Sequence, residues 1–399
     1  MKTIVLTRGD DLSPAAEILR QGGFCAVPTE TVYGLCVNGL DADAVAALYE
    51  LKGRPEVKPL SLMIPGADAM EKCAAQIPPQ AYTLAAKFWP GPLTIVLKAR
   101  DIIPAITLAG GSTVGLRCPD HPMTLSLLAS AGIPLAGPSA NPSGKPSPKT
   151  AAEVLGYFDG QIDALLDGGA CGIGKESTIL DLTVTPYRIL RQGALAEDAI
   201  DDALVAGMKV IGLTGGSGSG KTTVMNYLVE RGALGLDCDV VYHRLLEECE
   251  PMLSEIRERF PAAFPGGEFK RKALGAIVFS HAEALKDLNA ITHRYVREEV
   301  ARRLRSHARS GGTLVAIDAV ELIEGGLDKL CTFTVGVVAD AGKRAERIMA
   351  REGISEDYAR SRIAAQKGDE YYEQHCDRVI CNDGDRDALR SKCRELFGI

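Results

Sequence analysis

Residues 210–223 read VIGLTGGSGSGKTT and decide the fold of the half of the chain that contains them. The part from Gly215 to Thr222 has the pattern G-x-x-x-x-G-K-[ST], preceded by an apolar run and followed by a predicted helix over 223–230. The glycines let backbone N–H groups turn toward phosphate oxygens, and the helix N-terminus adds its dipole. A glycine-rich turn without a ligand is the alternative, which the order of strand, motif and helix disfavours.

The motif predicts the roles of its own residues. Lys221 is expected at the outer phosphates, and the Thr222 hydroxyl is expected to bind Mg²⁺. The remaining nucleotide-binding positions are Gly215, Gly216, Ser217, Gly218, Ser219, Gly220 and Thr223. Across this half of the chain, apolar runs over 210–213, 313–317 and 332–338 alternate with long helical segments, which predicts a three-layer α/β fold with a parallel sheet.

The phosphate acceptor requires residues outside this motif. Asp237 and Asp239, two residues apart at an expected strand end, are candidates for orienting a hydroxyl and Mg²⁺; the alternative is that Asp239 only caps a helix. Five arginines in a helical segment favour a lid beside the phosphates over a solvated helix face: Arg344, Arg347, Arg351, Arg360 and Arg362. Segment 288–293 is expected to precede a basic helix.

The chain divides near Gly207. Residues 197–207, EDAIDDALVAG, predict a last acidic helix, and a new buried strand follows Met208, as in a fusion of two genes. A length of 399 residues also favours two domains, which we place at 1–207 and 208–399. An apolar fraction of 46% and a charged fraction of 24% exclude disordered and highly charged proteins.

Charge and cysteine content limit the partners and the compartment. Residues 1–207 carry 16 basic and 22 acidic side chains, and residues 208–399 carry 29 and 30, so neither half has the basic excess of a nucleic-acid-binding protein. Eleven scattered cysteines without a Cys-x-x-Cys pair predict reduced thiols and no zinc site. Without an apolar run of membrane-spanning length or a secretion signal, we expect a cytoplasmic protein that does not bind membranes.

The first half shows a different pattern. Short apolar runs at 3–6, 24–27, 60–64 and 93–97 and helical patterns at 41–51 and 79–88 predict an α/β domain with a mixed sheet. Basic residues recur beside turns at the strand ends, at Lys52, Arg54, Lys58, Arg117 and Arg191. Their spacing leaves two alternatives open, a pocket for an anionic ligand and scattered surface charge.

The second half, over 208–399, resembles dephospho-CoA kinases through GLTGGSGSGKTTV, LDCD, RKALGAIVF, LNAITH, REGISEDYARSRIAAQ and CDRVICNDG. The resemblance implies ATP-dependent phosphorylation of the ribose 3′-hydroxyl of dephospho-CoA, the last step of coenzyme A biosynthesis. It implies that Asp239 is the catalytic base with Asp237 beside it, that Arg351 belongs to a lid and that Asn382 lies near the adenine. Arg294 and Glu321 depart from the family pattern, the latter at a normally apolar position.

The first half, from about residue 12 to 194, resembles YrdC-like threonylcarbamoyl-AMP synthases through PTETVYGL, KGRPEVKPL, WPGPLT, SANPSG and ESTILD. The resemblance implies that L-threonine, bicarbonate and ATP, with Mg²⁺, give threonylcarbamoyl-adenylate for N6-threonylcarbamoyladenosine in tRNA, transferred by a separate complex. It implies a catalytic set of Lys52, Arg54, Ser139 and Asn141. The implied substrate-binding residues are Thr29, Tyr33, Lys58, Arg117, Ser177 and Arg191.

Three alternatives stay open. The first alternative is that the first half is an RNA-binding module, although its net charge of −6 predicts weak or no tRNA binding by the chain alone. The second alternative is that the second half is another small-metabolite kinase of the same phosphate-loop class. The third is that one half is a degenerate regulatory domain, which the complete residue sets of both sites disfavour.

Overall fold

The computed structural model describes residues 2–278 and 280–399, which form two compact units. The first unit runs to Gly207 and also takes in Arg309–Gly311; the second comprises Met208–Ala308 and Gly312–Ile399. Each unit contains its own sheet and hydrophobic core, so each is described by itself.

The first unit is built on a mixed sheet, as predicted. Its described strands lie in the order β1-β9-β2-β3-β8-β4-β7-β6-β10-β11, with β5 paired to β6. Both parallel pairs, such as β4 with β7, and antiparallel pairs, such as β6 with β7, occur. The strands are β1 (Ile4–Thr7), β2 (Cys25–Val27), β3 (Gly34–Asn38), β4 (Ser61–Met63), β5 (Ala74–Ala75), β6 (Leu93–Ala99), β7 (Thr113–Arg117), β8 (Leu135–Ala136), β9 (Ala164–Asp167), β10 (Thr178–Asp181) and β11 (Arg188–Arg191).

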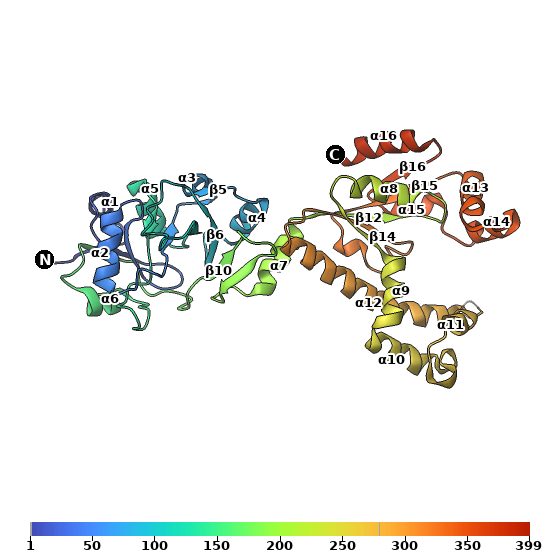
Figure 1. The fold of residues 1–399 in the computed structure, drawn as a ribbon, viewed down its shortest axis with the longest axis horizontal. Coiled ribbons are helices and arrows are strands. Elements are labelled where there is room, and N and C mark those ends of the chain that lie inside the picture. The colour runs from blue at the N-terminus through green and yellow to red at the C-terminus, as the bar shows by residue number, and fades with distance from the viewer. Residues whose placement is uncertain (1, 279) are drawn as a thin grey trace. The chain divides into compact units, whose positions relative to one another are not determined.

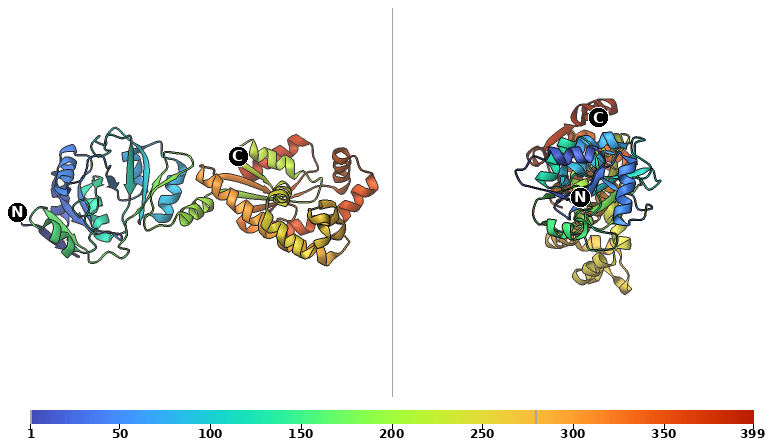
Figure 2. Two further views of the ribbon diagram at one scale, coloured as in Figure 1. Left: turned by 60° about the horizontal axis from the view of Figure 1, so that its bottom comes forward. Right: turned by 90° about the vertical axis from the view of Figure 1, so that its left-hand side faces the viewer.

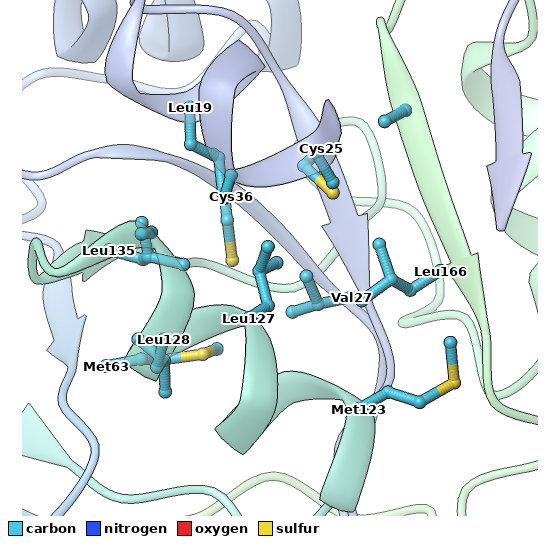
Figure 3. Packing of buried hydrophobic residues seen from close by; sticks show 14 residues of the cluster. Leu19, Cys25, Val27, Cys36, Met63, Met123, Leu127, Leu128, Leu135 and Leu166 are labelled. Carbon is cyan, nitrogen blue, oxygen red and sulfur yellow. The ribbon is translucent and has the colours of Figure 1, made fainter. Parts of the chain in front are cut away.

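Helices cover this sheet and enclose its core. They are α1 (Ser13–Arg20), α2 (Ala42–Lys52), α3 (Met70–Cys73), α4 (Pro79–Phe88), α5 (Pro122–Ala131), α6 (Ala151–Phe158) and α7 (Glu197–Ala206). Figure 3 shows Leu19 of α1 and Leu127 of α5 in one fully buried cluster with Val27 and Leu166 of the sheet. This packing fixes the strand ends, where the polar segments begin.

The ends of α2 explain how two predicted site residues are placed. Asp41 caps the start of the helix by accepting hydrogen bonds from the backbone N–H groups of Asp43 and Ala44. Gly53, with φ of 56°, ends it in the left-handed conformation that glycine adopts at low cost. Lys52 therefore stands in the last helical turn, and Arg54 begins the following loop.

The second unit has the predicted parallel sheet, with described strands in the order β13-β14-β12-β15-β16. These strands are β12 (Lys209–Thr214), β13 (Leu234–Asp237), β14 (Leu314–Asp318), β15 (Phe333–Val338) and β16 (Arg378–Cys381). The helices are α8 (Lys221–Val229), α9 (Cys238–Glu248), α10 (Glu250–Arg259), α11 (Arg271–Val278), α12 (Ala282–Arg309), α13 (Ala341–Glu352), α14 (Glu356–Ala364), α15 (Asp369–His375) and α16 (Arg386–Phe397).

Helices lie on both sides of this sheet, as Figures 1 and 2 show. In the left-hand view of Figure 2, the green α8 and red C-terminal helix lie above the strands, and the yellow and orange helices lie below. The central strand β12 carries the phosphate-loop motif at its carboxyl end. Open α/β sheets bind ligands at that edge, so the topology places the motif where a nucleotide site is expected.

Two local expectations need correction. Segment 288–293 lies inside the 28-residue helix α12 instead of ahead of it, because the buried residues Leu288, Thr292 and Val296 continue one stripe along the helix. The five arginines occupy two helices, α13 and α14, because Gly353 ends α13 in the left-handed conformation.

We expect a chain cut between Gly207 and Met208 to yield two soluble, folded pieces. Each piece contains a sheet with its own covering helices and is close to 200 residues, enough for an independent core. Soluble expression and a cooperative thermal transition measured by circular dichroism test this for each piece. Insolubility of both pieces would show that they share a core and that the boundary is wrong.

Candidate functional sites

A cavity of about 170 Å³ in the first unit brings together residues from distant parts of the sequence. It lies between the loops that follow β2, α2 and β8 and the ends of β7 and β11. Seven of the predicted site residues line it: Thr29, Tyr33, Arg54, Arg117, Ser139, Ser177 and Arg191. The fold therefore gathers basic and hydroxyl side chains at one place, which the sequence spacing left undecided.

Arg117 is oriented by a carboxylate that the sequence reasoning missed. Its Nη2 donates to Glu30 Oε1 at 2.8 Å and to Thr31 Oγ1 at 2.7 Å. Glu30 Oε2 in turn accepts from the backbone N–H of Asp120 at 3.0 Å. The buried Nε of Arg117 has no partner among the described residues, and a ligand oxygen would satisfy it. The sequence feature that could have pointed to Glu30 is an acidic residue within a segment rich in hydroxyl side chains, in a domain where basic residues recur beside turns.

Arg191 and Ser177 form the opposite part of the wall. Arg191 donates from Nε and Nη2 to the Ser177 carbonyl at 3.1 and 2.9 Å, and from Nη2 to Ser177 Oγ at 3.1 Å. Ser177 Oγ also lies 2.9 Å from Thr94 Oγ1. Burial lowers the pKa of Arg191, against the attraction of Glu176. Glu176, a lining residue for which we predicted no role, is a carboxylate with a pKa lowered by its hydrogen bond from Ser147.

Thr29 and Tyr33 shape the threonine segment of the resemblance. Thr29 Oγ1 donates to the Val32 carbonyl at 2.6 Å and accepts from the Val32 N–H at 3.2 Å, which closes a tight turn. Tyr33 donates its hydroxyl to the Gly169 carbonyl at 2.7 Å. Burial raises the pKa of Tyr33 to about 12, so its hydroxyl is neutral at physiological pH.

Three predicted residues do not line the cavity: Lys52, Asn141 and Lys58. Lys52 is buried, and its Nζ donates to the carbonyls of Ser139 and Asn141, so it holds the loop that carries Ser139. Asn141 Nδ2 donates to the carbonyls of Pro142 at 2.9 Å and Lys145 at 2.7 Å, while its buried Oδ1 has no partner among the described residues. Lys58 is exposed to solvent.

We expect the wild-type first unit to gain stability over a Lys52→Met variant as pH rises from about 7 to 9. Burial, with the nearby Arg54 charge, lowers the pKa of Lys52 to about 7 in the folded protein, below its ordinary value of 10.5. Between these two values the unfolded chain binds more protons, so the free energy of unfolding rises with pH, by at most about 1.4 kcal/mol per pH unit.

Denaturant unfolding followed by the fluorescence of Trp89, the single tryptophan, measures this effect in the first unit. Below pH 7 both states carry the proton and the stability difference between the two proteins should become constant. A difference that is the same at pH 7 and 9 would show that Lys52 keeps an ordinary pKa.

In the second unit, the phosphate loop connects β12 to α8 with a backbone that requires glycine at Gly220. Its φ is 106°, and a Cβ there would lie 2.1 Å from Asn382 Nδ2. Asn382 is buried and donates to the Ser219 carbonyl at 2.7 Å. In this structure Asn382 therefore braces the loop from behind. Ser219 Oγ is buried without a partner among the described residues.

A cavity of about 400 Å³ lies in front of this loop. The loop and the start of α8 contribute Ser217, Gly218, Gly220, Lys221 and Thr222. The ends of β13 and β14 contribute Asp237 and Asp318, the first turn of α9 contributes Asp239, and α13 and α14 contribute Arg347, Arg351 and Arg362. Lys221 Nζ donates to the Gly215 carbonyl at 2.9 Å, and burial lowers its pKa. Gly215, Gly216, Ser219 and Thr223 belong to the loop or to α8 without lining the cavity.

The two predicted aspartates have different surroundings. Asp237 is the N-cap of α9, since its Oδ1 accepts from the N–H groups of Asp239 at 2.9 Å and Val240 at 3.1 Å. The capping role that was the alternative for Asp239 therefore belongs to Asp237. The carboxylate of Asp239 makes no hydrogen bond to a described residue and faces the cavity.

Asp318 completes the acidic edge and was missed by the sequence reasoning. Burial raises its pKa to about 6, with the charges of Asp237 and Asp239 adding to the effect and Lys221 opposing it. The sequence feature that could have identified Asp318 is its place as the acidic last residue of an apolar strand, β14. That strand end lies at the same edge of the sheet as the phosphate loop.

The arginine helices contact the phosphate loop directly. Arg344 Nε donates to the Ser217 carbonyl at 3.0 Å, and Arg347 Nη1 donates to the Gly218 carbonyl at 3.2 Å. Arg351 and Arg362, both at the cavity, each bond Glu352 at 2.5 Å. Arg360 pairs with Glu356 on α14, and the lid role of these helices stays a prediction.

A second cavity, of about 960 Å³, adjoins the first, because Asp239 and Val320 line both. Most of its wall is apolar, with Leu274, Val278, Leu285, Leu288, Val296 and Leu327 among its lining residues. Its polar members include Arg271, Lys272, Asn289, His293 and Glu321. Asp239 thus lies on the wall that this larger cavity shares with the one in front of the phosphate loop, called the phosphate cavity below.

Among the described residues, no cluster of three or more His, Cys, Asp or Glu side chains has the geometry of a metal site. The phosphate cavity instead offers the Thr222 hydroxyl and the carboxylates of Asp237, Asp239 and Asp318. Hydroxyl and carboxylate oxygens suit Mg²⁺, which takes its other ligands from water and nucleotide phosphates.

None of the described helices is long and apolar enough to cross a bilayer.

Comparison with family models gives one match for each unit. The Sua5/YciO/YrdC model, described as telomere recombination, matches residues 17–193. The CoaE model, described as dephospho-CoA kinase, matches residues 209–387. The chain is also similar to a dephospho-CoA kinase of Corynebacterium efficiens, with 38% identity over 190 residues, 47% of this chain and 94% of that protein.

For the first unit, a threonylcarbamoyl-AMP synthase of Pyrococcus abyssi is 45% identical over 190 residues, 48% of this chain. The chain spans only 56% of that relative's length, and similar fractions of the Bacillus subtilis and Schizosaccharomyces pombe synthases. A crystal structure of P. abyssi Sua5 complexed with L-threonine superposes with a TM-score of 0.50 and 26% identity, covering 85% of this chain and all of that one.

Proposed function

Because the chain belongs to the dephospho-CoA kinase family through its second unit and carries a Sua5/YciO/YrdC-family domain in its first, we propose that it is a bifunctional enzyme. The second unit would phosphorylate dephospho-CoA, and the first would make threonylcarbamoyl-adenylate. ATP is the shared substrate. The observation that supports the kinase most directly is Asp239 on the wall between the phosphate cavity and the large acceptor cavity.

In the kinase reaction, the backbone N–H groups of the phosphate loop and Lys221 hold the ATP phosphates. Asp239, whose carboxylate is free of capping, accepts the proton of the acceptor 3′-hydroxyl or holds that oxygen in line with the γ-phosphate. Arg347, Arg351 and Arg362 face the same cavity and offset the charge that develops on the transferred group. Mg²⁺, held by Thr222 and the neighbouring carboxylates, would neutralise phosphate charge when bound.

In the first unit, the cavity would hold threonine and ATP. The deprotonated threonine amine adds to carbon dioxide and loses a proton, or reacts with bicarbonate with loss of water, and either route gives the carbamate. The carbamate oxygen then attacks the α-phosphate, and pyrophosphate leaves. Arg54, Arg117 and Arg191 surround this space and would bind the phosphates and the carboxylate. Lys52 and Asn141, which lie behind the lining, would position the loop of Ser139.

The threonylcarbamoyl-adenylate would pass to a separate transferase complex that acts on tRNA, and both reactions would take place in the cytoplasm. The first unit has a net charge of −6 over residues 1–207, so we expect little tRNA binding by the chain alone. A filter-binding assay with tRNA at about 150 mM salt distinguishes this from the RNA-binding alternative.

The direct test is to assay the full chain for both products by mass spectrometry. One reaction contains ATP, Mg²⁺ and dephospho-CoA, and the other contains ATP, Mg²⁺, L-threonine and bicarbonate. A panel of other nucleoside and metabolite acceptors with labelled ATP accompanies the first. Preference for a different acceptor would assign the second unit to another kinase activity, and absence of threonylcarbamoyl-adenylate would refute the synthase assignment.

A further inference from the structure

The acceptor cavity of the second unit contains a glutamate that is held in a fixed orientation. Glu321, in the turn after β14, lines the cavity with a side chain that is half exposed. Its Oε2 lies 2.9 Å from His293 Nε2 and accepts a hydrogen bond from Asn289 Nδ2 at 3.2 Å. Both partners belong to α12 and also line the cavity, so one helix fixes the position of this carboxylate through two contacts.

The second oxygen of this carboxylate is available to a ligand. Glu321 Oε1 makes no hydrogen bond to any described residue, whereas Oε2 makes two. The hydrogen bond from His293 lowers the pKa of Glu321, so the group is ionised near neutral pH and accepts hydrogen bonds without donating them. Because Glu321 is half exposed, water solvates this oxygen in the free protein, and an occupant that displaces the water must supply a donor in its place.

The same cavity has two cations on a different element. Arg271 and Lys272 of α11 line it, and neither side chain has an ion-pair or hydrogen-bond partner among the described residues. An anionic segment of a ligand is attracted to α11 and repelled by Glu321. A ligand with an anionic segment and a neutral, donor-bearing end therefore enters in one orientation.

We propose that Glu321, oriented by His293 and Asn289, is a specificity-determining residue that accepts a hydrogen bond from a neutral hydroxyl or amino group of the phosphoryl acceptor. Arg271 and Lys272 bind the anionic segment of the same molecule. Glu321 directly follows Val320, which lines both cavities, so the group that it binds belongs to the end of the acceptor nearest the transferred phosphate. This inference rests on the proposed kinase function.

Steady-state kinetics of the full chain with dephospho-CoA and ATP test the proposal. Loss of a hydrogen bond to a charged group corresponds to about 10- to 100-fold, so Glu321→Leu should raise the KM for dephospho-CoA at least about tenfold and change the KM for ATP less than twofold. Glu321→Gln keeps an acceptor oxygen and should raise the first KM only about threefold. His293→Asn should fall between them, because the carboxylate loses its orienting partner.

The matched control is Glu255, which pairs with Arg294 and Tyr295 of the same helix α12 but does not line the cavity. Glu255→Leu should leave both KM values unchanged. A merely structural role for Glu321 would lower thermal stability without separating the KM for dephospho-CoA from that for ATP. An unchanged acceptor KM in Glu321→Leu, or in Glu321→Gln and His293→Asn if the leucine variant does not fold, overturns the inference and leaves the kinase function intact.

Failure of the proposed function gives a different result. If the wild-type chain does not phosphorylate dephospho-CoA, calorimetric titration of that compound into wild type and Glu321→Leu decides the inference separately. Binding that is at least about tenfold weaker in the variant supports the role of Glu321. Equal binding, or no binding to wild type, overturns it.

Discussion

Lys221→Ala is expected to abolish formation of coenzyme A and to leave threonylcarbamoyl-adenylate synthesis near the wild-type rate. Lys221 is the lysine of the phosphate-loop motif and the single lysine among the described residues that line the phosphate cavity, where the other cations are arginines of α13 and α14. The first unit contains its own basic cavity, so it does not depend on this lysine. Parallel product assays by mass spectrometry on one preparation measure both effects.

Lys270→Ala is the control for this experiment, since Lys270 is exposed, pairs with Glu268 and lines neither cavity of the second unit. It should retain both activities. Loss of both activities in folded Lys221→Ala protein would contradict the model of two separate sites. Retained coenzyme A formation would remove Lys221 from the phosphate site.

Asp239→Asn should lower the turnover of dephospho-CoA by at least about 100-fold, because general-base and positioning roles contribute roughly 10²–10⁴-fold. The affinity for ATP should change less than about threefold, since the cradle of backbone N–H groups stays intact. The substitution keeps the shape of the side chain and removes its charge. Measurement of kcat, together with ATP binding by calorimetry, separates the two effects.

Asp340→Asn is the matched control. Asp340 caps α13 through the N–H groups of Gly342 and Lys343, and asparagine caps helices about as well as aspartate. Its turnover should remain near normal. Near-normal turnover in Asp239→Asn would instead place Asp239 outside the reaction. Because the structure assigns the cap of α9 to Asp237, a large loss cannot be attributed to a missing Asp239 cap.

The roles of Glu30 and Asp318 show why part of the site escaped the sequence reasoning. Glu30 acts on Arg117, which is 87 residues away, and Asp318 meets Lys221 only because β14 lies beside β12 in the sheet. Neither residue belongs to a local pattern that identifies its partner. A strand that ends in an acid was visible in 314–318, but its neighbours in the sheet were not.

A functional element can be predicted from the sequence when a single continuous segment contains all of its residues. The phosphate loop combines strand, glycines, lysine and helix start within 210–223, so its existence and its position at a strand end followed from the sequence. The two sheet types could be predicted as well, because the order of apolar strand patterns and helical patterns along the chain reflects short-range preferences of the residues.

The amino-acid pattern alone thus indicates the two α/β classes, the phosphate loop and most of the candidate residues of both sites. Long-range packing establishes which of them share a cavity. It brings Arg54, Arg117 and Arg191 to one cavity wall and bonds Lys52 to the loop that carries Ser139. It also gave the helix cap to Asp237 and left Asp239 free. The physical reason is that burial, hydrogen-bond partners and charge neighbours depend on contacts between distant segments, which strand order and packing establish and residue spacing does not encode.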